Sequence, residues 1–550
     1  MATPSPFRVP GAYPPPLIGV KEIKGKSRRM PEDSSERGGE GMGRGRLRGR
    51  TAVAPPFGGS PGDRLLSGLP PNAIAKQDEG AKIAIHLLPL SPSCHPRPTM
   101  RLLPLLLAAT MSTVPFLLYG QTYQDGIDAY EVVDYEAAAE IFFLLAEEGD
   151  ARAMNLLGVM YQDGKGVPQD YTEAVEWYRL AAEQGNADAQ NNLGMMYANG
   201  EGVPQNYELA ADWFRLAAEN GVAVAQYNLG SRYRTGEGVR QDYELAAKWY
   251  RLAADQGNAV AQYSLALMYN NGNGVPQDST EAAKWYQLAA EQGNSRAQYN
   301  LGLMYSKAKG VPQNYEEAAK WFSLAAEQGE SSAQYNLGVM YQNGKGVPQD
   351  YDEAVRWYRL AAEQGNSEAQ YNLGFAYYND EGVRQDHAEA AKWFRMAAEE
   401  GDSRAQYNLG LMYSKGRGVP QDYEKAAKWY GLAAEQGLAD AQNNLALMYY
   451  QGKGVPQDYA EAAKWFHMAA VQGEDSAQFN LGVMYYDGDG VVKNSTNAFI
   501  LFNLAVAQGD KIARKNRDIA GKKLTLDQLA DAQRLSSEWE VGEPLPLQGD

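Results

Sequence analysis

Two histidines, His387 and His467, are the side chains after Met100 best suited to acid–base catalysis or metal binding. They stand 80 residues apart, and no Ser-His-Asp or His-metal arrangement can be assembled from them. The one cysteine, Cys94, precedes Met100, so the chain from Met100 onward offers neither a thiol nucleophile nor a disulfide. We therefore expect a protein that is not an enzyme and that has no catalytic residues, no metal and no cofactor.

Glycine-rich loops recur along the chain and raise the question of phosphate or calcium binding. The loop GEGVPQ from Gly200 lacks the preceding strand of a phosphate-binding loop, and a proline follows its glycines. The stretch DGDG from Asp487 resembles the start of a calcium loop but lacks the later acidic ligands. Asn494 begins a glycosylation sequon and also stands where a helix cap is expected. These patterns favour turns and caps over ligand sites.

Tyrosines that share one position of a 36-residue period are the candidate partner-binding residues. They are Tyr227, Tyr263, Tyr299, Tyr335, Tyr371 and Tyr407. An apolar side chain follows four residues later in most cases, so both lie on one side of a helix, away from its main apolar face. Rigid amphipathic rings of this kind bind peptides well. The sequence leaves two alternatives open, a concave binding groove and a core between successive repeats.

Tryptophan and glycine fix the period of the chain. Nine tryptophans, from Trp177 to Trp465, are each 36 residues apart, and glycines from Gly149 to Gly509 keep the same step. A fixed period without insertions is typical of a solenoid, in which each repeat packs mainly on its neighbours. The phase of the tryptophans places them with the buried alanines, so we expect them to pack in the core.

Each repeat contains two predicted helices. Apolar residues of the first fall on one face from about 187 to 199, after the cap Asn186, and the second begins at Tyr207, after the cap Asn206. An Asp cap followed by Glu, as at Asp170, predicts a capping box. Acidic and basic residues four apart predict ion pairs on the exposed face. A glycine recurs in the middle of the first helix, as at Gly194, and we expect a Trp or Ala of a neighbouring helix to pack against it.

The repeats resemble a known family. The stretch AQYNLGVMYQNGKGVPQDYDEAVRWYRLAAEQG from Ala333 is similar to the Sel-like repeat, a 36-residue relative of the tetratricopeptide repeat. The resemblance covers ten repeats from about Asp150 to Gly509. It implies an all-α fold, a right-handed superhelical α-solenoid of antiparallel helix pairs. It also implies a scaffold or adaptor that binds proteins or peptides on its concave face.

Charge separates the first 99 residues from the remainder. Residues 1–99 hold 15 Lys and Arg against 8 Asp and Glu, whereas the whole chain has a net charge of −17. The first segment is rich in Pro, Gly and Arg and lacks apolar periodicity, so we expect a disordered basic extension. The acidic remainder argues against a nucleic-acid partner, because phosphate contacts need Lys and Arg.

Residues 100–120 have the pattern of a secretory signal peptide, with one Arg, an apolar stretch and small residues near Gly120. Such a signal normally begins a chain, so the pattern favours Met100 as the true start. We expect export, to the periplasm or medium in a bacterium. An uncleaved segment of this length would instead be a membrane anchor.

The expected organisation is therefore an extension (1–99), a signal peptide (100–120), an N-terminal capping hairpin (121–149), ten repeats (150–509), and C-terminal capping helices with a tail (510–550). We expect the exported scaffold to bind an unidentified protein or peptide. A secreted effector that binds a host protein uses the same binding physics and remains an alternative. A hydrolase directed at cell walls or antibiotics is a second alternative, but the residues offer it no nucleophile–base pair.

Overall fold

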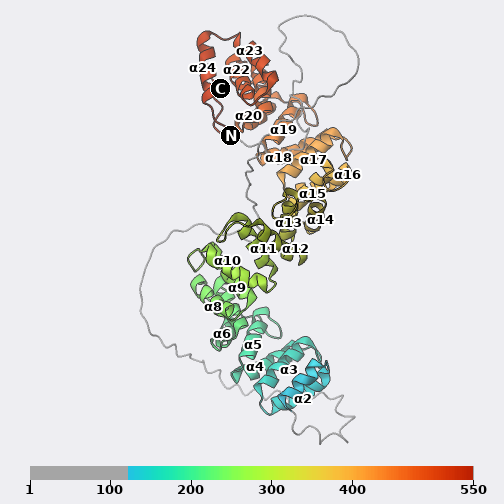
Figure 1. Cartoon of the computed structure of the whole chain (residues 1–550), viewed down its shortest axis with the longest axis vertical. Helices are drawn as coiled ribbons and strands as arrows, with labels where there is room; N and C mark the ends of the chain where they lie inside the picture. The colour runs from blue at the N-terminus through green and yellow to red at the C-terminus, as the bar shows by residue number, and fades with distance from the viewer. Residues whose placement is uncertain (1–121, 549–550) are drawn as a thin grey trace, which may run out of the picture. The chain divides into compact units, whose positions relative to one another are not determined.

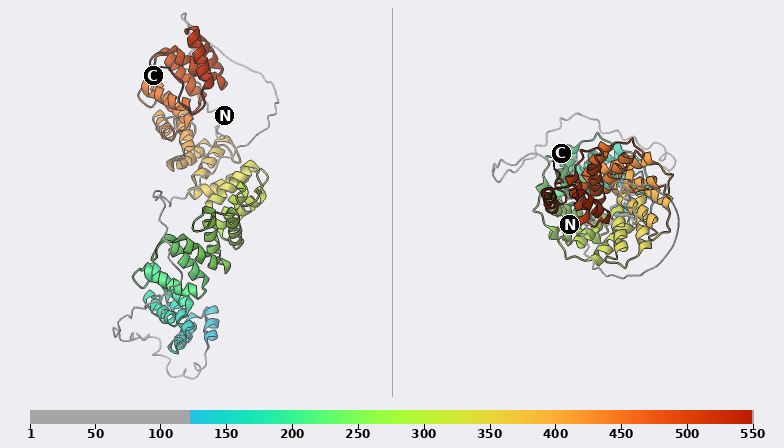
Figure 2. Two further views of the ribbon diagram at one scale, coloured as in Figure 1. Left: turned by 90° about the vertical axis from the view of Figure 1, so that its left-hand side faces the viewer. Right: turned by 90° about the horizontal axis from the view of Figure 1, so that it is seen from above.

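The computed structural model describes residues 122–548, which form 24 α-helices (Figure 1). The predictions for residues 1–99 and 100–120 lie outside the described residues. The described chain divides into an N-terminal part, residues 122–261 with 273–276, and a C-terminal part, residues 262–272 with 277–548. In each part successive helices pack in pairs, and the views of Figure 2 show helical ribbons throughout the described segments.

The N-terminal part contains the first eight helices. They are α1 (Tyr123–Glu131), α2 (Tyr135–Glu147), α3 (Ala151–Asp163), α4 (Tyr171–Glu183), α5 (Ala187–Asn199), α6 (Tyr207–Glu219), α7 (Ala223–Thr235) and α8 (Tyr243–Asp255). Helix α9 (Ala259–Asn271) begins in this part and lies mainly in the next. Helices α1 and α2 pack together over the range predicted as a capping hairpin.

The C-terminal part continues the same alternation of first and second helices. These helices are α10 (Ser279–Glu291), α11 (Ser295–Lys307), α12 (Tyr315–Glu327), α13 (Ser331–Asn343), α14 (Tyr351–Glu363), α15 (Ser367–Asn379), α16 (His387–Glu399), α17 (Ser403–Lys415), α18 (Tyr423–Glu435), α19 (Ala439–Gln451), α20 (Tyr459–Val471), α21 (Asp475–Asp487), α22 (Ser495–Ala507), α23 (Lys511–Gly521) and α24 (Leu526–Glu538). Each first helix packs on the second helix of its own repeat, and that helix packs on the first helix of the next repeat. The predicted all-α solenoid of paired helices is confirmed.

The helix ends follow the predicted caps. Asn186 accepts a hydrogen bond from the backbone N–H of Ala189, and Asn206 accepts one from Leu209, so α5 and α6 begin at the predicted residues. Gly200 ends α5 in a left-handed conformation, with φ of 76°.

The predicted capping boxes and ion pairs are corrected by the structure. Asp350 caps α14 through the backbone N–H of Glu353, but the Glu353 carboxylate pairs with Arg356, three residues later, at 3.0 Å. Glu461 pairs with Lys464 in the same way. The glutamate therefore turns to the cation on the next turn of its own helix, which competes with a bond back to the cap.

The glycine in the middle of each first helix accommodates an aromatic ring of the second helix. A Cβ atom built on Gly338 would lie 2.7 Å from the ring of Tyr358, and one built on Gly194 would lie 2.8 Å from Phe214. The predicted Trp was wrong, because the residue after the tryptophan makes the contact, whereas the predicted Ala also takes part: the carbonyl oxygen of Ala210 lies 3.2 Å from a Cβ atom built on Gly194. This close approach explains why glycine recurs although it weakens a helix by about 1 kcal/mol.

Buried glutamines join consecutive repeats. In the N-terminal part, Gln226 Nε2 donates to the carbonyl of Ala218 at 3.1 Å, and Gln226 Oε1 accepts from Gln256 at 2.8 Å. The same two bonds recur in the C-terminal part at Gln298, Gln334, Gln406, Gln442 and Gln478. These bonds satisfy a polar group in the core and fix the register between repeats.

One position interrupts this series in the C-terminal part. Gln370 donates to Ala362, but Glu400 stands where the other repeats have the second glutamine, and the buried Oε1 of Gln370 has no partner. A carboxylate cannot donate a hydrogen bond, so the bond that the second glutamine donates to the first in other repeats is missing here.

Candidate functional site

The six candidate tyrosines lie on the first helices α7, α9, α11, α13, α15 and α17. Four of the rings are half-buried, those of Tyr227, Tyr263, Tyr299 and Tyr335. Tyr371 is 0 % exposed and Tyr407 is 6 % exposed, so these two belong to the core. The tyrosines therefore do not form one uniform surface, and the role of the half-buried ones in binding stays a prediction.

Each tyrosine rests on an aromatic ring of the second helix of its own repeat. The ring centroids of Tyr299 and Phe322 are 5.9 Å apart, and those of Tyr335 and Tyr358 are 6.1 Å apart. Tyr371 stands 5.7 Å from Phe394. The side of each tyrosine ring that faces the second helix of its own repeat is thus packed. The side that faces away from that helix has different neighbours in different repeats.

The hydroxyls of Tyr263 and Tyr299 bond side chains of the next repeat. Burial raises the pKa of Tyr263, and a hydrogen bond with Asn300 opposes this shift. Burial also raises the pKa of Tyr299, and bonds with Ser332 and Asn336 oppose it. The polar end of the ring is therefore anchored while one edge remains accessible.

The residue of the next repeat that stands beside the tyrosine differs between repeats. Over Tyr371 this residue is Arg404, whose guanidinium carbon lies 4.3 Å from the ring centroid. Glu368 and Asp402 hold that guanidinium in ion pairs, with the Glu368 oxygen at 2.7 Å. At the corresponding place beside Tyr299 stands Ser332, which is too short to cover the ring.

Repeats without the tyrosine keep the same helix pair. Asn191 replaces it in α5, and Asn228 Nδ2 donates to Asn191 Oδ1 at 3.0 Å. Asn155 and Asn443 accept equivalent bonds from Asn192 and Asn480. The helices that carry these asparagines, α3, α5 and α19, each keep 13 residues. The tyrosine is therefore not required for the fold of a repeat.

The two histidines, the DGDG loop and Asn494, which the sequence analysis also considered, lie at helix ends, within a helix or in a loop. His387 begins α16 and its ring lies 4.9 Å from that of Tyr378, whereas His467 lies within α20. Asp489 of the DGDG loop accepts a hydrogen bond from the Tyr450 hydroxyl at 2.7 Å. Asn494 caps α22 through the backbone N–H groups of residues 496 and 497, which confirms its predicted role as a cap.

The tryptophans lie at the packing surfaces of the second helices, as predicted. Trp177, Trp321 and Trp357 are each 7 % exposed, and Trp393 is 8 % exposed. The other five of the series are half-buried. They contribute to the core rather than to a ladder of ligand sites.

A row of exposed aliphatic residues was missed by the sequence reasoning. Its members share one position of the second helix and are 36–44 % exposed; they are Leu144, Leu180, Leu252, Leu288, Leu324, Leu360, Met396, Leu432 and Met468. Their recurrence at the 36-residue period was the available signal.

Within residues 122–548, the structure contains no group of three or more His, Cys, Asp or Glu side chains that could hold a metal ion. None of the helices in this range is both long and apolar enough to cross a membrane.

The fold and the regular surface define a helical repeat protein built from 36-residue units. The profile of the Sel1 repeat family matches eleven consecutive segments, of which the first spans residues 117–150 and the last 475–510. The chain belongs to the Sel1 repeat family. The first match extends the repeats over α1 and α2, next to the ten predicted from the sequence.

Two solved structures are similar to this chain, and the first shows the same fold. A protective antigen of uropathogenic Escherichia coli with an SLR fold is 40 % identical, with a TM-score of 0.69 over 74 % of this chain and 88 % of that one. A Sel1 repeat protein from Oxalobacter formigenes is 37 % identical, with a TM-score of 0.45 over 55 % of this chain and 87 % of that one. A comparison with curated proteins found no match.

Proposed function

We propose that this chain is an exported scaffold that binds a protein or peptide through three half-buried tyrosines of its C-terminal part, Tyr263, Tyr299 and Tyr335. Sel1 repeat proteins generally mediate protein interactions, and the proposal specifies where on this chain the partner binds.

One observation carries the proposal. Repeats with asparagine at the tyrosine position form the same helix pair, so the tyrosine adds little that the fold requires. Tyr263, Tyr299 and Tyr335 nevertheless recur in consecutive repeats of the C-terminal part, and each stays half-buried. Aromatic rings with an accessible edge and an anchored hydroxyl lose little conformational freedom on binding, and they dominate many interfaces.

The chain itself suggests the variant that tests this surface. Replacing Tyr263, Tyr299 and Tyr335 together by asparagine copies the residue that other repeats carry. The matched control is the same substitution at Tyr171, Tyr243 and Tyr351, which are 38–41 % exposed at the start of second helices.

Affinity capture from the source organism, with the three proteins in parallel, gives the answer. We expect the first variant to lose the partner that the wild type and the control retain. Equal recovery of that partner by both variants would exclude the tyrosine surface as the binding site.

Export is the second element of the proposal, and it rests on residues 100–120. The protein of uropathogenic Escherichia coli is a protective antigen, which fits a protein that meets the outside of the cell. N-terminal sequencing of the native protein should find a start near Gln121. Recovery of the peptide GGEGMGRGR, which precedes Met100, would refute it. Capture of a host protein rather than one of the organism's own would favour the effector alternative.

A further inference from the structure

Arginines on the second helices bridge to the next repeat in the C-terminal part. Arg359 of α14 donates through Nη2 to the hydroxyl of Tyr377 at 3.0 Å. Arg395 of α16 makes the same bond with Tyr413 at 2.9 Å. Each arginine thus occupies a place between its own second helix and the tyrosine of the following first helix.

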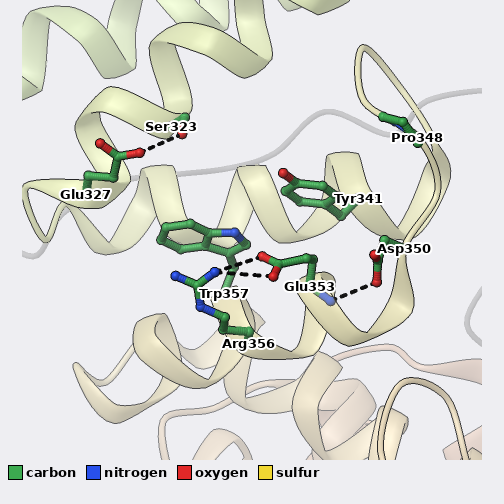
Figure 3. Close-up of a pocket in the computed structure, with 8 residues that line it drawn as sticks. All are labelled: Ser323, Glu327, Tyr341, Pro348, Asp350, Glu353, Arg356 and Trp357. Atoms are coloured by element: carbon green, nitrogen blue, oxygen red, sulfur yellow. Dashed lines mark hydrogen bonds and ion pairs between the residues drawn. The ribbon is translucent and has the colours of Figure 1, made fainter.

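At the same position of α12 the residue is Ser323. Its hydroxyl bonds Glu327, one turn later on the same helix, at 3.2 Å. It is too short to reach Tyr341 as Arg359 reaches Tyr377. The space is a cavity of about 540 Å³ lined by Ser323, Glu327, Tyr341 and residues of α14 (Figure 3). This volume lies within the usual range for ligand pockets, about 300–1,000 Å³.

The charges around the cavity favour a cation. Glu327, Asp350 and Glu353 contribute three carboxylates, and Arg356 contributes one guanidinium. That guanidinium pairs with Glu353 and lies 4.8 Å from the ring centroid of Trp357, so its charge is already compensated. Two carboxylates remain without a basic partner among the lining residues.

Trp357 contributes an aromatic ring to the cavity. Trp357 is 7 % exposed, and its indole Nε1 has no hydrogen-bond partner. The indole ring lines the cavity between Ser323 and Tyr341 (Figure 3). This N–H is covered by the chain, so the indole contributes its ring and not its donor to the lining of the cavity.

We propose that the cavity at Ser323 binds an arginine side chain of a peptide partner. The guanidinium takes the place that the chain's own Arg359 and Arg395 take in later repeats and donates to the Tyr341 hydroxyl. Glu327 compensates its charge, and the Trp357 ring forms a wall of the cavity. None of the proposed partner-binding tyrosines lines this cavity. A test of the arginine site is therefore independent of a test of the tyrosine surface.

The test follows the indole N–H resonance of Trp357 in the full chain labelled with nitrogen-15 at tryptophan. Loss of one resonance in Trp357→Phe assigns the signal. Titration with N-acetyl-arginine methylamide should shift this resonance in a saturable way. In Ser323→Arg the new arginine of the chain fills the cavity, so binding of the arginine probe should weaken by about tenfold or more. Ser323→Ala leaves the cavity open and should bind the probe like the wild type.

The citrulline analogue is the matched probe, because it keeps the shape of arginine without its charge. We expect it to bind about tenfold more weakly. Absence of a shift with the arginine probe, equal binding to Ser323→Arg, or equal binding of citrulline would each overturn the proposal. If Ser323→Arg loses its helical circular dichroism, Ser323→Gln replaces it, because Gln287 holds this position in α10.

Discussion

Tyr299 and Tyr371 occupy the same position of two repeats in the C-terminal part but have different surroundings. Both rest on a phenylalanine of the second helix, at 5.9 Å and 5.7 Å between ring centroids. Ser332 leaves Tyr299 half-buried, whereas Arg404 and its two carboxylate partners bury Tyr371 completely. Arg404 therefore contributes to the burial of Tyr371, but an arginine at this place is not sufficient, because Arg296 stands at the corresponding place beside Tyr263, which stays half-buried.

The largest difference is expected when the rings are removed. Tyr371→Ala should lower the free energy of unfolding by about 3–5 kcal/mol, because a fully buried ring leaves a cavity. Tyr299→Ala should lower it by about 1–2 kcal/mol, since part of the ring faces water in the folded state. Urea unfolding of both variants measures these free energies, and equal losses of stability in the two variants would contradict the expected difference. Hydrogen exchange should place the damage in the neighbouring repeats first.

Alkaline pH provides a second contrast. Burial raises the pKa of Tyr371 above the value of about 10 expected in the unfolded chain. The folded state then keeps a proton that the unfolded state loses, so this stabilisation is fully present below about pH 10 and falls as the pH rises further. Urea midpoints at about pH 8 and about pH 11 should therefore differ less in Tyr371→Phe than in the wild type. If the wild type and Tyr371→Phe show the same pH dependence, Tyr371 does not contribute to the loss of stability at alkaline pH.

Removing the cover should expose the buried ring. Arg404→Ser copies Ser332, and we expect a loss of about 1–2 kcal/mol from the cation–π contact and the ion pairs. Tyr371 should then react with tetranitromethane at a rate close to that of Tyr299. Arg296→Ser is the control, because Arg296 is exposed. A protected Tyr371 in Arg404→Ser would mean that other residues bury it.

The smallest effect is expected for Tyr299→Asn. Asn336 should donate to the new asparagine as Asn228 donates to Asn191 at 3.0 Å in the N-terminal part. We expect the free energy of unfolding to change by less than about 1 kcal/mol. Thermal melts of Tyr299→Asn and Tyr371→Asn measure this difference. A larger loss of stability in Tyr299→Asn than in Tyr371→Asn would contradict the expected order.

The sequence predicted the repeating framework well, because that framework depends on local signals. Helix α5 begins and ends where its caps and apolar period indicated, and Tyr207 begins α6. The ring that packs on Gly194 was misassigned to tryptophan, because helical phase identifies a face but not which neighbouring residue points across it.

The candidate surface was less predictable, because it depends on residues about 33 positions away. Arg404 contributes to the burial of Tyr371, and the cavity at Ser323 lies where some other repeats carry an arginine. Neither relation follows from a consensus repeat, because the residue at each of these two positions varies from repeat to repeat.

The most direct test of the binding surface is hydroxyl-radical footprinting of the full chain alone and with its captured partner bound. We expect the modification rates of Tyr263, Tyr299 and Tyr335 to fall several-fold in the complex, because a bound partner covers their accessible edges. The rates of Tyr171, Tyr243 and Tyr351 should not change. Unchanged rates at the first three tyrosines, with protection elsewhere on the chain, would contradict the proposal that they bind the partner.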